Sequence, residues 1–319
     1  MKTLTRNETA DFLLNNDNYA ILTHRRPDGD TIGSSAALCR ILRKMGKIAY
    51  IIRNDEISDR FAWLHEGLTV QEPQEGAILV TTDVASPQML PEAFKKHLGH
   101  IALRIDHHGA ATSFTDLELV DPDSASCAEL IWDVVEAMGA RMDAALAAAV
   151  YVGTSTDTGC FRFSNTTDHT FATAAKCAAA GARIYELNQE LFETNSLGRL
   201  RIQGWIVEHM KLFGDGKLAI VAIPKAVERE LSLTEDDMDN ISNFPRTVSG
   251  VKMAATLREE GTGRCKLSVR AVPGWDATLV TTRFGGGGHK GAAGASFSCT
   301  LEEAAKMVEE AMLELSGNS

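Results

Sequence analysis

The chain has 319 residues, of which 44% are hydrophobic and 24% charged, a composition typical of soluble globular proteins. The length favours two domains, each large enough to bury a core of its own. The formal net charge of −11 argues against long duplex DNA or RNA as a ligand, because phosphate contacts require a basic surface. A short oligonucleotide or a single nucleotide is compatible with this charge if positive side chains gather locally.

The sequence carries no signal for export or for a membrane. Its first residues lack the apolar stretch of a secretory signal, and no apolar run approaches the roughly 18 residues of a membrane span. The six cysteines are scattered without a Cys-x-x-Cys pair, which favours reduced thiols over a disulfide framework or a zinc site. We therefore expect a cytoplasmic protein without a membrane partner.

Short apolar strands alternate with helices in the first part of the chain. This pattern predicts an α/β domain whose mostly parallel sheet is flanked by helices. The predicted strands are residues 19–24, 48–52, 77–82 and 101–105, and the predicted helices are residues 32–44 and 92–97.

Helices dominate the middle of the chain, and strands return towards its end. The predicted helices are residues 124–138 (opened by Asp123 or Ser124), 143–152, 167–180 and a polar stretch at 184–210. Strands at 218–223, 251–257 and 266–270, with a helix at 301–315, predict a second, smaller α/β domain. We expect the acidic stretch 228–239 to be a solvent-exposed helix face. The predicted organisation is one domain at 1–190, a helical linker at 191–215 and a second domain at 216–319.

The first candidate site residues follow the first predicted strand. His24 ends this strand, and Asp28 and Asp30 lie in a loop shaped by Pro27 and Gly29. A lone Asp-x-Asp pair is weak evidence, and His24 alone would be interpreted as an ordinary histidine at a strand end. Together, the three side chains offer imidazole and carboxylate donors to one cavity.

Three further fragments place acids and imidazoles after apolar segments. Asp83 follows the predicted strand at 77–82, and Asp106-His107-His108 follows the one at 101–105. Asp157 follows the alanine-rich predicted helix at 143–152. A buried carboxylate is costly unless it is paired or binds a metal, although Asp83 could also be a helix N-cap. Open α/β sheets bind ligands at the carboxyl ends of their strands, where we expect all these residues. Such donors suit a pair of Mn²⁺-like cations.

The last fragment is the glycine run at 285–288, followed by His289. Gly286-x-Gly288-x-x-Gly291 formally fits a dinucleotide fingerprint, but too little chain follows for the required βαβ unit, so we reject NAD. Glycines let backbone amides approach an anion closely, which favours a phosphate site. A flexible hairpin is the alternative interpretation.

The triplet Asp106-His107-His108, in this order with the other fragments, resembles the DHH phosphoesterase superfamily, and the glycine-rich end resembles its DHH-associated C-terminal domain. Within the superfamily the chain is similar to the oligoribonuclease (nanoRNase) and 3′-phosphoadenosine-5′-phosphate phosphatase group. The resemblance implies two Mn²⁺ ions, with Mg²⁺ or Co²⁺ as substitutes. One would be held by His24, Asp28 and Asp83, and the other by Asp30, Asp83, His107 and Asp157.

The resemblance also implies roles outside the two metal sites. His108 would face the scissile phosphate, and Asp106 would orient an imidazole. The terminal phosphate and sugar of the substrate would be bound in the second domain, across a groove between the domains, by Arg258, Arg270, Gly286, Gly287, Gly288 and His289.

The implied activity is hydrolysis of very short RNA to mononucleotides and of 3′-phosphoadenosine-5′-phosphate to AMP and phosphate. The alternative is a phosphodiesterase for cyclic or linear dinucleotides such as cyclic di-AMP and pApA. A pyrophosphatase is less favoured, because it lacks the glycine-rich loop with its histidine. A nucleotide-binding protein without catalysis is disfavoured, because every expected ligand is present. The sequence leaves open whether the chain forms a homodimer.

Overall fold

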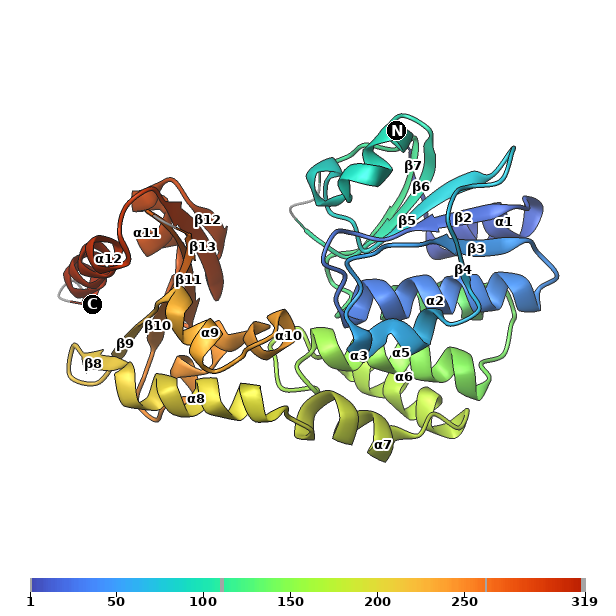
Figure 1. Ribbon diagram of the computed structural model, residues 1–319. Helices are drawn as coiled ribbons and strands as arrows, with labels where there is room; N and C mark the ends of the chain where they lie inside the picture. Colours follow the sequence, from blue (N-terminus) through green and yellow to red (C-terminus); the bar gives the residue numbers. More distant parts are fainter. Residues whose placement is uncertain (1, 110–111, 262, 317–319) are drawn as a thin grey trace. The chain divides into compact units, whose positions relative to one another are not determined.

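The computed structural model describes residues 2–109, 112–261 and 263–316 (Figure 1). The chain divides into two compact units, Met1–Thr194 and Asn195–Ser319. Among the described residues, no helix combines the length and apolar character needed to cross a membrane. All six cysteines are free thiols, as the sequence predicts.

The first unit is built on a sheet of seven parallel strands. Runs of Val, Ile and Leu form its central strands, because both faces of the sheet are covered. The predicted parallel α/β sheet is therefore confirmed. In spatial order the strands are β1 (Lys2–Thr3), β7 (Leu117–Val120), β6 (Ile101–Asp106), β5 (Ile78–Thr82), β2 (Tyr19–Leu22), β3 (Ala49–Ile52) and β4 (Thr69–Val70).

Long helices lie on one side of this sheet and form the main core with it (Figure 1). They are α1 (Arg6–Asn15), α2 (Gly29–Lys44), α4 (Cys127–Ala137), α5 (Ala144–Asp157) and α6 (Asp168–Ala179). Of these, α2 and α4 pack on the strands, and α5 and α6 form a further layer on these helices. Helices α2 and α5 pack closely because Gly33 faces Gly153, and a Cβ on Gly33 would lie 2.5 Å from the Ala149 carbonyl oxygen. The opposite face is covered by η2 (Pro87–Met89) and η3 (Glu92–His97), through residues such as Leu90 and Phe94.

Short helices complete the first unit. They are α3 (Asp59–Ala62), η1 (Trp63–His65), α7 (Ile184–Asn188) and the π-helix η4 (Gln189–Glu193). The segment predicted as a linker, 191–215, contains α8 (Leu197–His209). Ile202 and Ile206 of α8 are fully buried in a core of the second unit.

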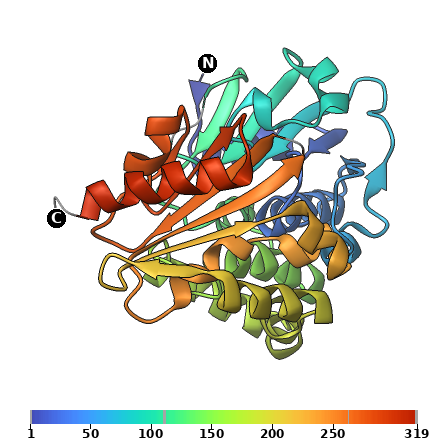
Figure 2. The same ribbon diagram turned by 60° about the vertical axis from the view of Figure 1, so that its left-hand side comes forward.

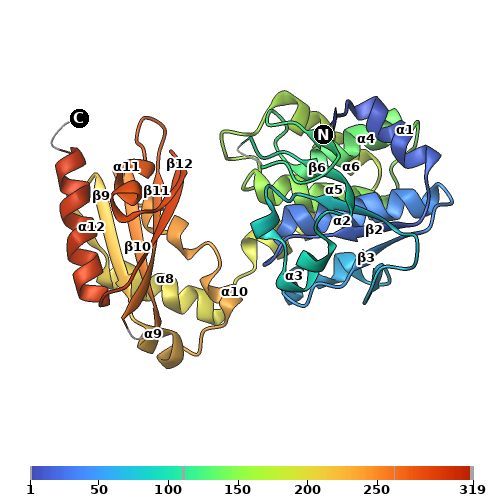
Figure 3. The ribbon, with the colours of Figure 1, turned by 90° about the horizontal axis from the view of Figure 1, so that it is seen from above.

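The second unit carries a six-stranded sheet in which β9 and β10 are parallel and the other neighbours are antiparallel. Helix α12 (Leu301–Ser316) covers one face, and α8 with α9 (Lys225–Glu230) covers the other (Figures 2 and 3). In spatial order the strands are β12 (Gly287–His289), β13 (Ala292–Phe297), β11 (Arg264–Ala271), β10 (Met253–Gly261), β9 (Leu218–Ile223) and β8 (Lys211–Phe213). The remaining short elements are α10 (Glu235–Met238), η5 (Ile241–Asn243), η6 (Pro245–Thr247), α11 (Thr278–Thr281) and η7 (Thr282–Phe284).

The expectation of a solvent-exposed acidic face at 228–239 is confirmed for Glu230, Glu235, Asp236 and Asp239, which are exposed, but it is wrong for the other two acids. Glu228 is only 8% exposed, and it forms ion pairs with Lys225 and Arg258. Asp237 is also buried and caps its own short helix by accepting a hydrogen bond from the Thr234 amide. Both acids are stabilised by partners that a charge count along the chain does not identify.

Candidate metal centre

Three of the predicted ligands lie at one edge of the parallel sheet. His24 follows β2, Asp83 directly follows β5, and Asp106 ends β6 with His107 and His108 after it. Strands β6, β5 and β2 are neighbours, so their carboxyl ends bring these side chains together. The predicted strand-end positions are confirmed for these fragments.

The two acids of the Asp28-Gly29-Asp30 fragment belong to a helix start and not to an open loop. Asp28 is the N-cap of α2, where its Oδ1 accepts hydrogen bonds from the amides of Asp30 and Thr31. Asp30 is buried, and its two carboxylate oxygens accept from the amides of Cys127 (2.7 Å) and Ala128 (2.9 Å) at the start of α4. The first turns of two helices thus fix both carboxylates.

Asp157 is the last residue of α5, so the expectation that it stands at a strand end is wrong. The helix continues past Val152 to Asp157 because Gly153 and the small polar residues after it fit against α2 and α4. The helix end still delivers this carboxylate to the cluster, with its Oδ2 lying 3.5 Å from His107 Nε2.

The carboxylate of Asp83 lies between two groups of donors. Its Oδ2 is 3.5 Å from His24 Nε2, and its Oδ1 is 3.6 Å from His107 Nε2. His24 Nε2 is also 3.6 Å from Asp28 Oδ1, and His107 Nε2 is 3.7 Å from Asp30 Oδ2. These separations are too long for hydrogen bonds. They suit pairs of donors that share one cation, since each donor would lie about 2.1 Å from the ion.

Backbone carbonyls orient the two imidazoles towards these acids. His24 Nδ1 donates to the Arg25 carbonyl (2.8 Å), and His107 Nδ1 donates to the Ser124 carbonyl (3.2 Å). Each ring therefore turns its Nε2 towards the carboxylates, which is the usual arrangement of a metal-binding histidine.

The charges of the cluster fit a bound cation. Asp83 is 2% exposed, its Oδ1 has no hydrogen-bond partner among the described residues, and its backbone adopts a left-handed φ of 60°. Burial, followed by the charges of Asp83, Asp157 and Asp28, raises the pKa of Asp30 well above its usual range. A bound cation would give the unpaired oxygen of Asp83 a partner. Its positive charge would also offset the repulsion among the buried carboxylates.

Two other titrating groups respond to the same crowding. Burial, despite the opposing charge of His107, raises the pKa of Asp157 to about 7. Burial disfavours the charged form of His24, but the nearby carboxylates of Asp28 and Asp83 outweigh it and raise the imidazole pKa well above its usual range.

His108 is held differently from the other two imidazoles. Its Nδ1 donates to Asp106 Oδ1 at 2.8 Å, and Asp106 is fully buried. The same oxygen accepts from the amides of His107 (2.9 Å) and His108 (3.3 Å). The hydrogen bond with Asp106 outweighs burial and raises the pKa of His108 to about 9. His108 is therefore a cation at neutral pH with a second N–H free to donate.

Several residues that the sequence did not single out hold these ligands in place. Asn54 is buried and donates to the His24 carbonyl (2.9 Å), and Asn165 donates to the Asp157 carbonyl (3.2 Å). Arg104 donates to the carbonyls of Ala85 (3.3 Å) and Thr112 (3.1 Å), on the segments after Asp83 and after His108. No local motif identifies such residues, because each contacts the backbone of a distant segment.

The predicted phosphate-binding residues lie in the second unit, and its sheet register brings some of them into one row. His289 pairs with Ala292, Ala292 with Arg270, and Arg270 with Ala254. Directly paired residues of antiparallel strands share a face, so His289 and Arg270 project from one face about 10 Å apart, two strand spacings. Arg258 shares this face but lies four residues, about 13 Å, further along β10 than Ala254.

Both arginines already have partners within the unit. Arg258 forms an ion pair with Glu228 (3.1 Å), and Arg270 Nε donates to Asn243 Oδ1 (2.7 Å). Burial, with the nearby charge of Arg246, lowers the pKa of Arg270.

The glycine run forms the β12–β13 hairpin, and two of its glycines have a packing reason. A Cβ on Gly286 would collide with the Gly294 carbonyl oxygen, and one on Gly288 would lie 2.6 Å from the Ala292 carbonyl oxygen. Gly287 has no described atom within 4 Å of the corresponding position. The hairpin therefore explains Gly286 and Gly288 but not Gly287.

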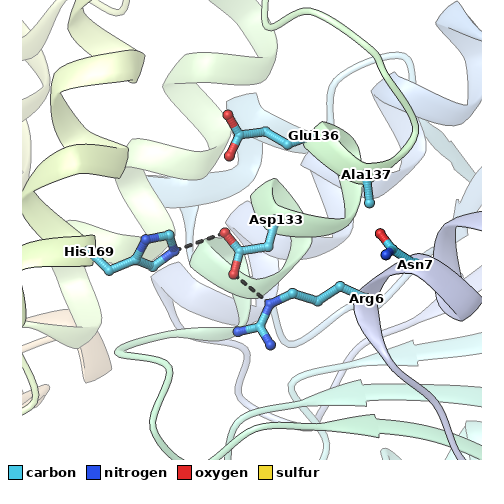
Figure 4. Close-up of a pocket in the computed structure, with 6 residues that line it drawn as sticks. All are labelled: Arg6, Asn7, Asp133, Glu136, Ala137 and His169. Carbon is cyan, nitrogen blue, oxygen red and sulfur yellow. Dashed lines mark hydrogen bonds and ion pairs between the residues drawn. The ribbon is translucent and has the colours of Figure 1, made fainter.

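A surface cavity elsewhere in the first unit does not share the chemistry of the cluster (Figure 4). Asp133 in this cavity accepts from Arg6 Nε (2.7 Å) and from His169 Nε2 (2.8 Å). The negative charge of Asp133 is thus already neutralised by neighbouring side chains. The cavity is lined by Arg6, Asn7, Asp133, Glu136, Ala137 and His169.

Comparison with known proteins agrees with the resemblance. Residues 18–154 match the DHH family, N-terminal domain, and residues 215–314 match the DHHA1 domain. A bifunctional oligoribonuclease and PAP phosphatase NrnA from Thermus thermophilus is 33% identical over 92% of this chain and 89% of its own. The chain belongs to the DHH family. An NrnA of the same description from Bacillus subtilis is 27% identical over 88% of this chain and 89% of its own.

Structural comparison supports the same fold for this DHH-family chain. An exopolyphosphatase-related protein from Bacteroides fragilis superposes with a TM-score of 0.88 at 25% identity, covering 98% of this chain and 96% of its own. A cyclic-di-AMP phosphodiesterase GdpP from Geobacillus thermodenitrificans is 24% identical over 95% of this chain but only 48% of its own. The oligoribonuclease and PAP phosphatase relatives thus match a larger share of their own length than the GdpP relative does.

Proposed function

We propose that this DHH-family protein is a two-metal phosphoesterase that hydrolyses very short RNA to mononucleotides and 3′-phosphoadenosine-5′-phosphate to AMP and phosphate. The observation that carries the proposal is the position of Asp83, whose two oxygens face His24 and His107 at 3.5 and 3.6 Å. One carboxylate shared by two groups of donors is the arrangement that a two-metal site requires.

The proposed cofactor is a pair of Mn²⁺ ions, for which Mg²⁺ or Co²⁺ can substitute. The carboxylate donors suit Mn²⁺ and Mg²⁺, and the two imidazoles are donors that other first-row divalent cations also accept. Bound cations lower the pKa of a water molecule and neutralise phosphate charge. The first group of ligands is His24, Asp28 and Asp83, and the second is Asp30, Asp83, His107 and Asp157.

The side chains around this site position the substrate and move a proton. His108, cationic through its hydrogen bond with Asp106, donates from Nε2 to the phosphate or to its leaving oxygen. Asp106 keeps the ring oriented, because its Oδ1 binds Nδ1 and two backbone amides. In the second unit, Arg270 and His289 bind the terminal phosphate and sugar of the substrate, together with Arg258 and the amides of Gly286, Gly287 and Gly288.

The acidic chain favours short substrates. With a net charge of −11, affinity cannot come from a long basic track, so local contacts with one or two nucleotides must supply it. The proposal therefore includes nucleic-acid binding only for short single strands, and a cytoplasmic location, where such RNA fragments arise.

A hydrolysis panel with Mn²⁺ tests the proposal. It compares an RNA of two to five nucleotides, 3′-phosphoadenosine-5′-phosphate, cyclic di-AMP, pApA and pyrophosphate. Cleavage of the short RNA and release of phosphate from 3′-phosphoadenosine-5′-phosphate are expected. Turnover confined to cyclic di-AMP or pApA would replace the proposal with second-messenger hydrolysis, and turnover of pyrophosphate alone would refute both.

A further inference from the structure

The segment after Asp157 has an unusual backbone. Three consecutive residues, Gly159, Cys160 and Phe161, have left-handed φ angles of 57°, 59° and 61°. Two of them carry side chains that disfavour this conformation, so the surrounding contacts must hold the turn. The Thr158 carbonyl accepts from the amides of Arg162 (2.9 Å) and Phe163 (3.0 Å), which folds the chain back on itself.

This turn places the ring of Phe163 flat against Gly159. A Cβ on Gly159 would lie no more than 2.6 Å from Cζ, Cε1 and Cε2 of Phe163, at nearly the same distance from all three. Equal distances to three atoms of one ring place that point over the face of the ring and not at its edge. One face of Phe163 therefore packs on glycine backbone, while the side chain remains 45% exposed.

The neighbouring aromatic residue has a different environment. Phe161 stacks on Phe171, with ring centroids 5.5 Å apart, and also contacts Tyr151 at 5.8 Å. Its ring is therefore covered by two aromatic neighbours, although Phe171 is itself 56% exposed. Phe163 has no aromatic partner among the described residues, although a large exposed apolar ring is costly in water.

The turn that carries the exposed ring begins at the candidate metal centre. Gly159 is two residues after Asp157, so their Cα atoms are at most about 7 Å apart. Asn165, at the other end of the turn, donates to the Asp157 carbonyl (3.2 Å) and to the Ala125 carbonyl (2.9 Å). The turn is thus fixed at both ends to the residue whose carboxylate faces His107.

We propose that the exposed face of Phe163 is a stacking platform for a nucleobase of the substrate, next to the phosphate that is cleaved. This inference rests on the proposed function and adds the part of the substrate that the metal cluster cannot recognise. Every base has a flat π-face, so a rigid aromatic ring binds bases without demanding one sequence. Arg162 is exposed beside the ring, with its Nε fixed on the Gly159 carbonyl (2.5 Å), and adds positive charge to the platform.

The test compares substrates with and without a base. The Mn²⁺-loaded protein is titrated with an adenine dinucleotide whose internucleotide link cannot be hydrolysed, and with the same compound lacking both bases. The variants are Phe163→Leu, Phe163→Tyr and Tyr185→Leu. Tyr185 is 70% exposed on α7 and controls for loss of a surface aromatic ring. Turnover of the cleavable counterparts is measured in parallel.

Phe163→Leu should weaken binding of the adenine dinucleotide by about five- to a hundredfold, from the usual contribution of base–aromatic stacking. Binding of the abasic compound should stay unchanged, Phe163→Tyr should restore the affinity, and Tyr185→Leu should match the parent protein. Equal weakening for both compounds, or no weakening for either, would overturn the platform. If the parent protein binds the dinucleotide through Phe163 but cleaves no substrate, the platform stands and the proposed hydrolysis fails.

Discussion

The two units use charged side chains in opposite ways. In the first unit, Asp30, Asp83 and Asp157 converge on His107 at 3.5–3.7 Å, and burial leaves an oxygen of Asp83 without a hydrogen-bond partner among the described residues. In the second unit, Arg258 and Arg270 are already bound to Glu228 and Asn243. The acidic cluster is therefore incomplete without a cation, whereas the arginines are held in place before any ligand arrives.

This difference predicts how each region contributes. A cluster of buried carboxylates gains stability when metal binds, so its residues should control metal occupancy and turnover. Arginines that must exchange or share a partner to bind phosphate should contribute modestly to affinity and not to metal binding. Substitutions in the two units should thus separate the two effects.

The largest effect is expected from Asp83→Asn. The amide fits the left-handed backbone at this position, but it removes the charge that two donor groups share. Turnover of every substrate should fall by about a thousandfold or more, because a catalytic cation contributes several kcal/mol. Mn²⁺ stoichiometry by equilibrium dialysis should fall as well. His289→Ala should raise KM with normal stoichiometry.

Asp11→Asn is the matched control for Asp83→Asn, since Asp11 is an exposed acid on α1. It should leave both turnover and Mn²⁺ stoichiometry unchanged. Full activity of Asp83→Asn would refute the two-metal assignment, and loss of Mn²⁺ binding in His289→Ala would remove the contrast between the units.

The next effect concerns the buried ion pair of Arg104 and Glu118, whose charged groups are 3.1 Å apart and almost fully buried. Arg104→Met should destabilise the protein by about 3–5 kcal/mol, because the buried charge of Glu118 loses its cation and keeps only the hydroxyls of Ser113 and Thr115 as donors. Mn²⁺ affinity should fall about 10–100-fold, since the segments after Asp83 and His108 lose the side-chain anchor they share and keep only the hydrogen bond from the Thr112 amide to the Ala85 carbonyl. Denaturant unfolding and calorimetric titration measure the two quantities.

The double substitution Arg104→Met with Glu118→Leu separates stability from positioning. Replacing both charges with apolar groups should recover most of the unfolding free energy. The carbonyls of Ala85 and Thr112 would still lack the Arg104 guanidinium, although Ala85 keeps the Thr112 amide as a donor, so Mn²⁺ affinity should stay low. If the unfolding free energy and the Mn²⁺ affinity both recovered in the double variant, Arg104 would act only on folding. Arg258→Met, at a side chain 27% exposed, should cost much less stability and leave Mn²⁺ affinity unchanged.

Much of the first unit could be predicted because apolar runs mark its strands and acids follow them directly. The positions of His24, Asp83 and Asp106 at strand ends are confirmed. The end of α5 was placed too early, because Gly153 favours a helix stop by local propensity. In the fold this glycine is retained for packing, since a Cβ there would collide with Ala128.

Other features depend on contacts between distant segments, so no local pattern reveals them. Strands β12 and β13 are rich in glycine and alanine and lack the alternation typical of a strand. The burial of Glu228 depends on Arg258, 30 residues away. Arg104 occupies a strand that otherwise reads as apolar, and its partner Glu118 belongs to a neighbouring strand. The metal, substrate and domain-boundary assignments beyond the family itself stay predictions.

Metal binding to the acidic cluster of the first unit should depend on pH. With its pKa raised to about 7, Asp157 keeps a proton in the metal-free folded state that the unfolded chain releases near pH 4. Its contribution to stability is therefore full below the unfolded pKa and is lost as the pH rises through about 7. Metal must displace this proton, and also those that the raised pKa values of Asp30 and His24 keep on these two ligands. Mn²⁺ affinity should therefore rise with pH, by about tenfold per unit for each proton displaced, and should continue to rise above pH 7.

Calorimetric titration of Mn²⁺ in two buffers of different ionisation enthalpy measures the released protons directly. Proton release should be larger near pH 6 than near pH 8, because Asp157, with its pKa of about 7, has lost its proton by pH 8 while His24, with its raised pKa, still has one to release. An affinity that does not change across this range would show that the carboxylates of the cluster are already ionised without metal.

The smallest effect is expected in the second unit, from Gly287→Ala. Gly287 does not have a left-handed φ and has open space where a Cβ would lie, so alanine should not disturb the hairpin. If its amide approaches the substrate phosphate, the added methyl group should raise KM by about fivefold, the value of one ordinary hydrogen bond. Gly204→Ala, on α8 with equally open surroundings, is the control and should leave KM unchanged. An unchanged KM for Gly287→Ala would instead favour the hairpin alternative, in which the glycine run serves only the close packing of β12 on β13.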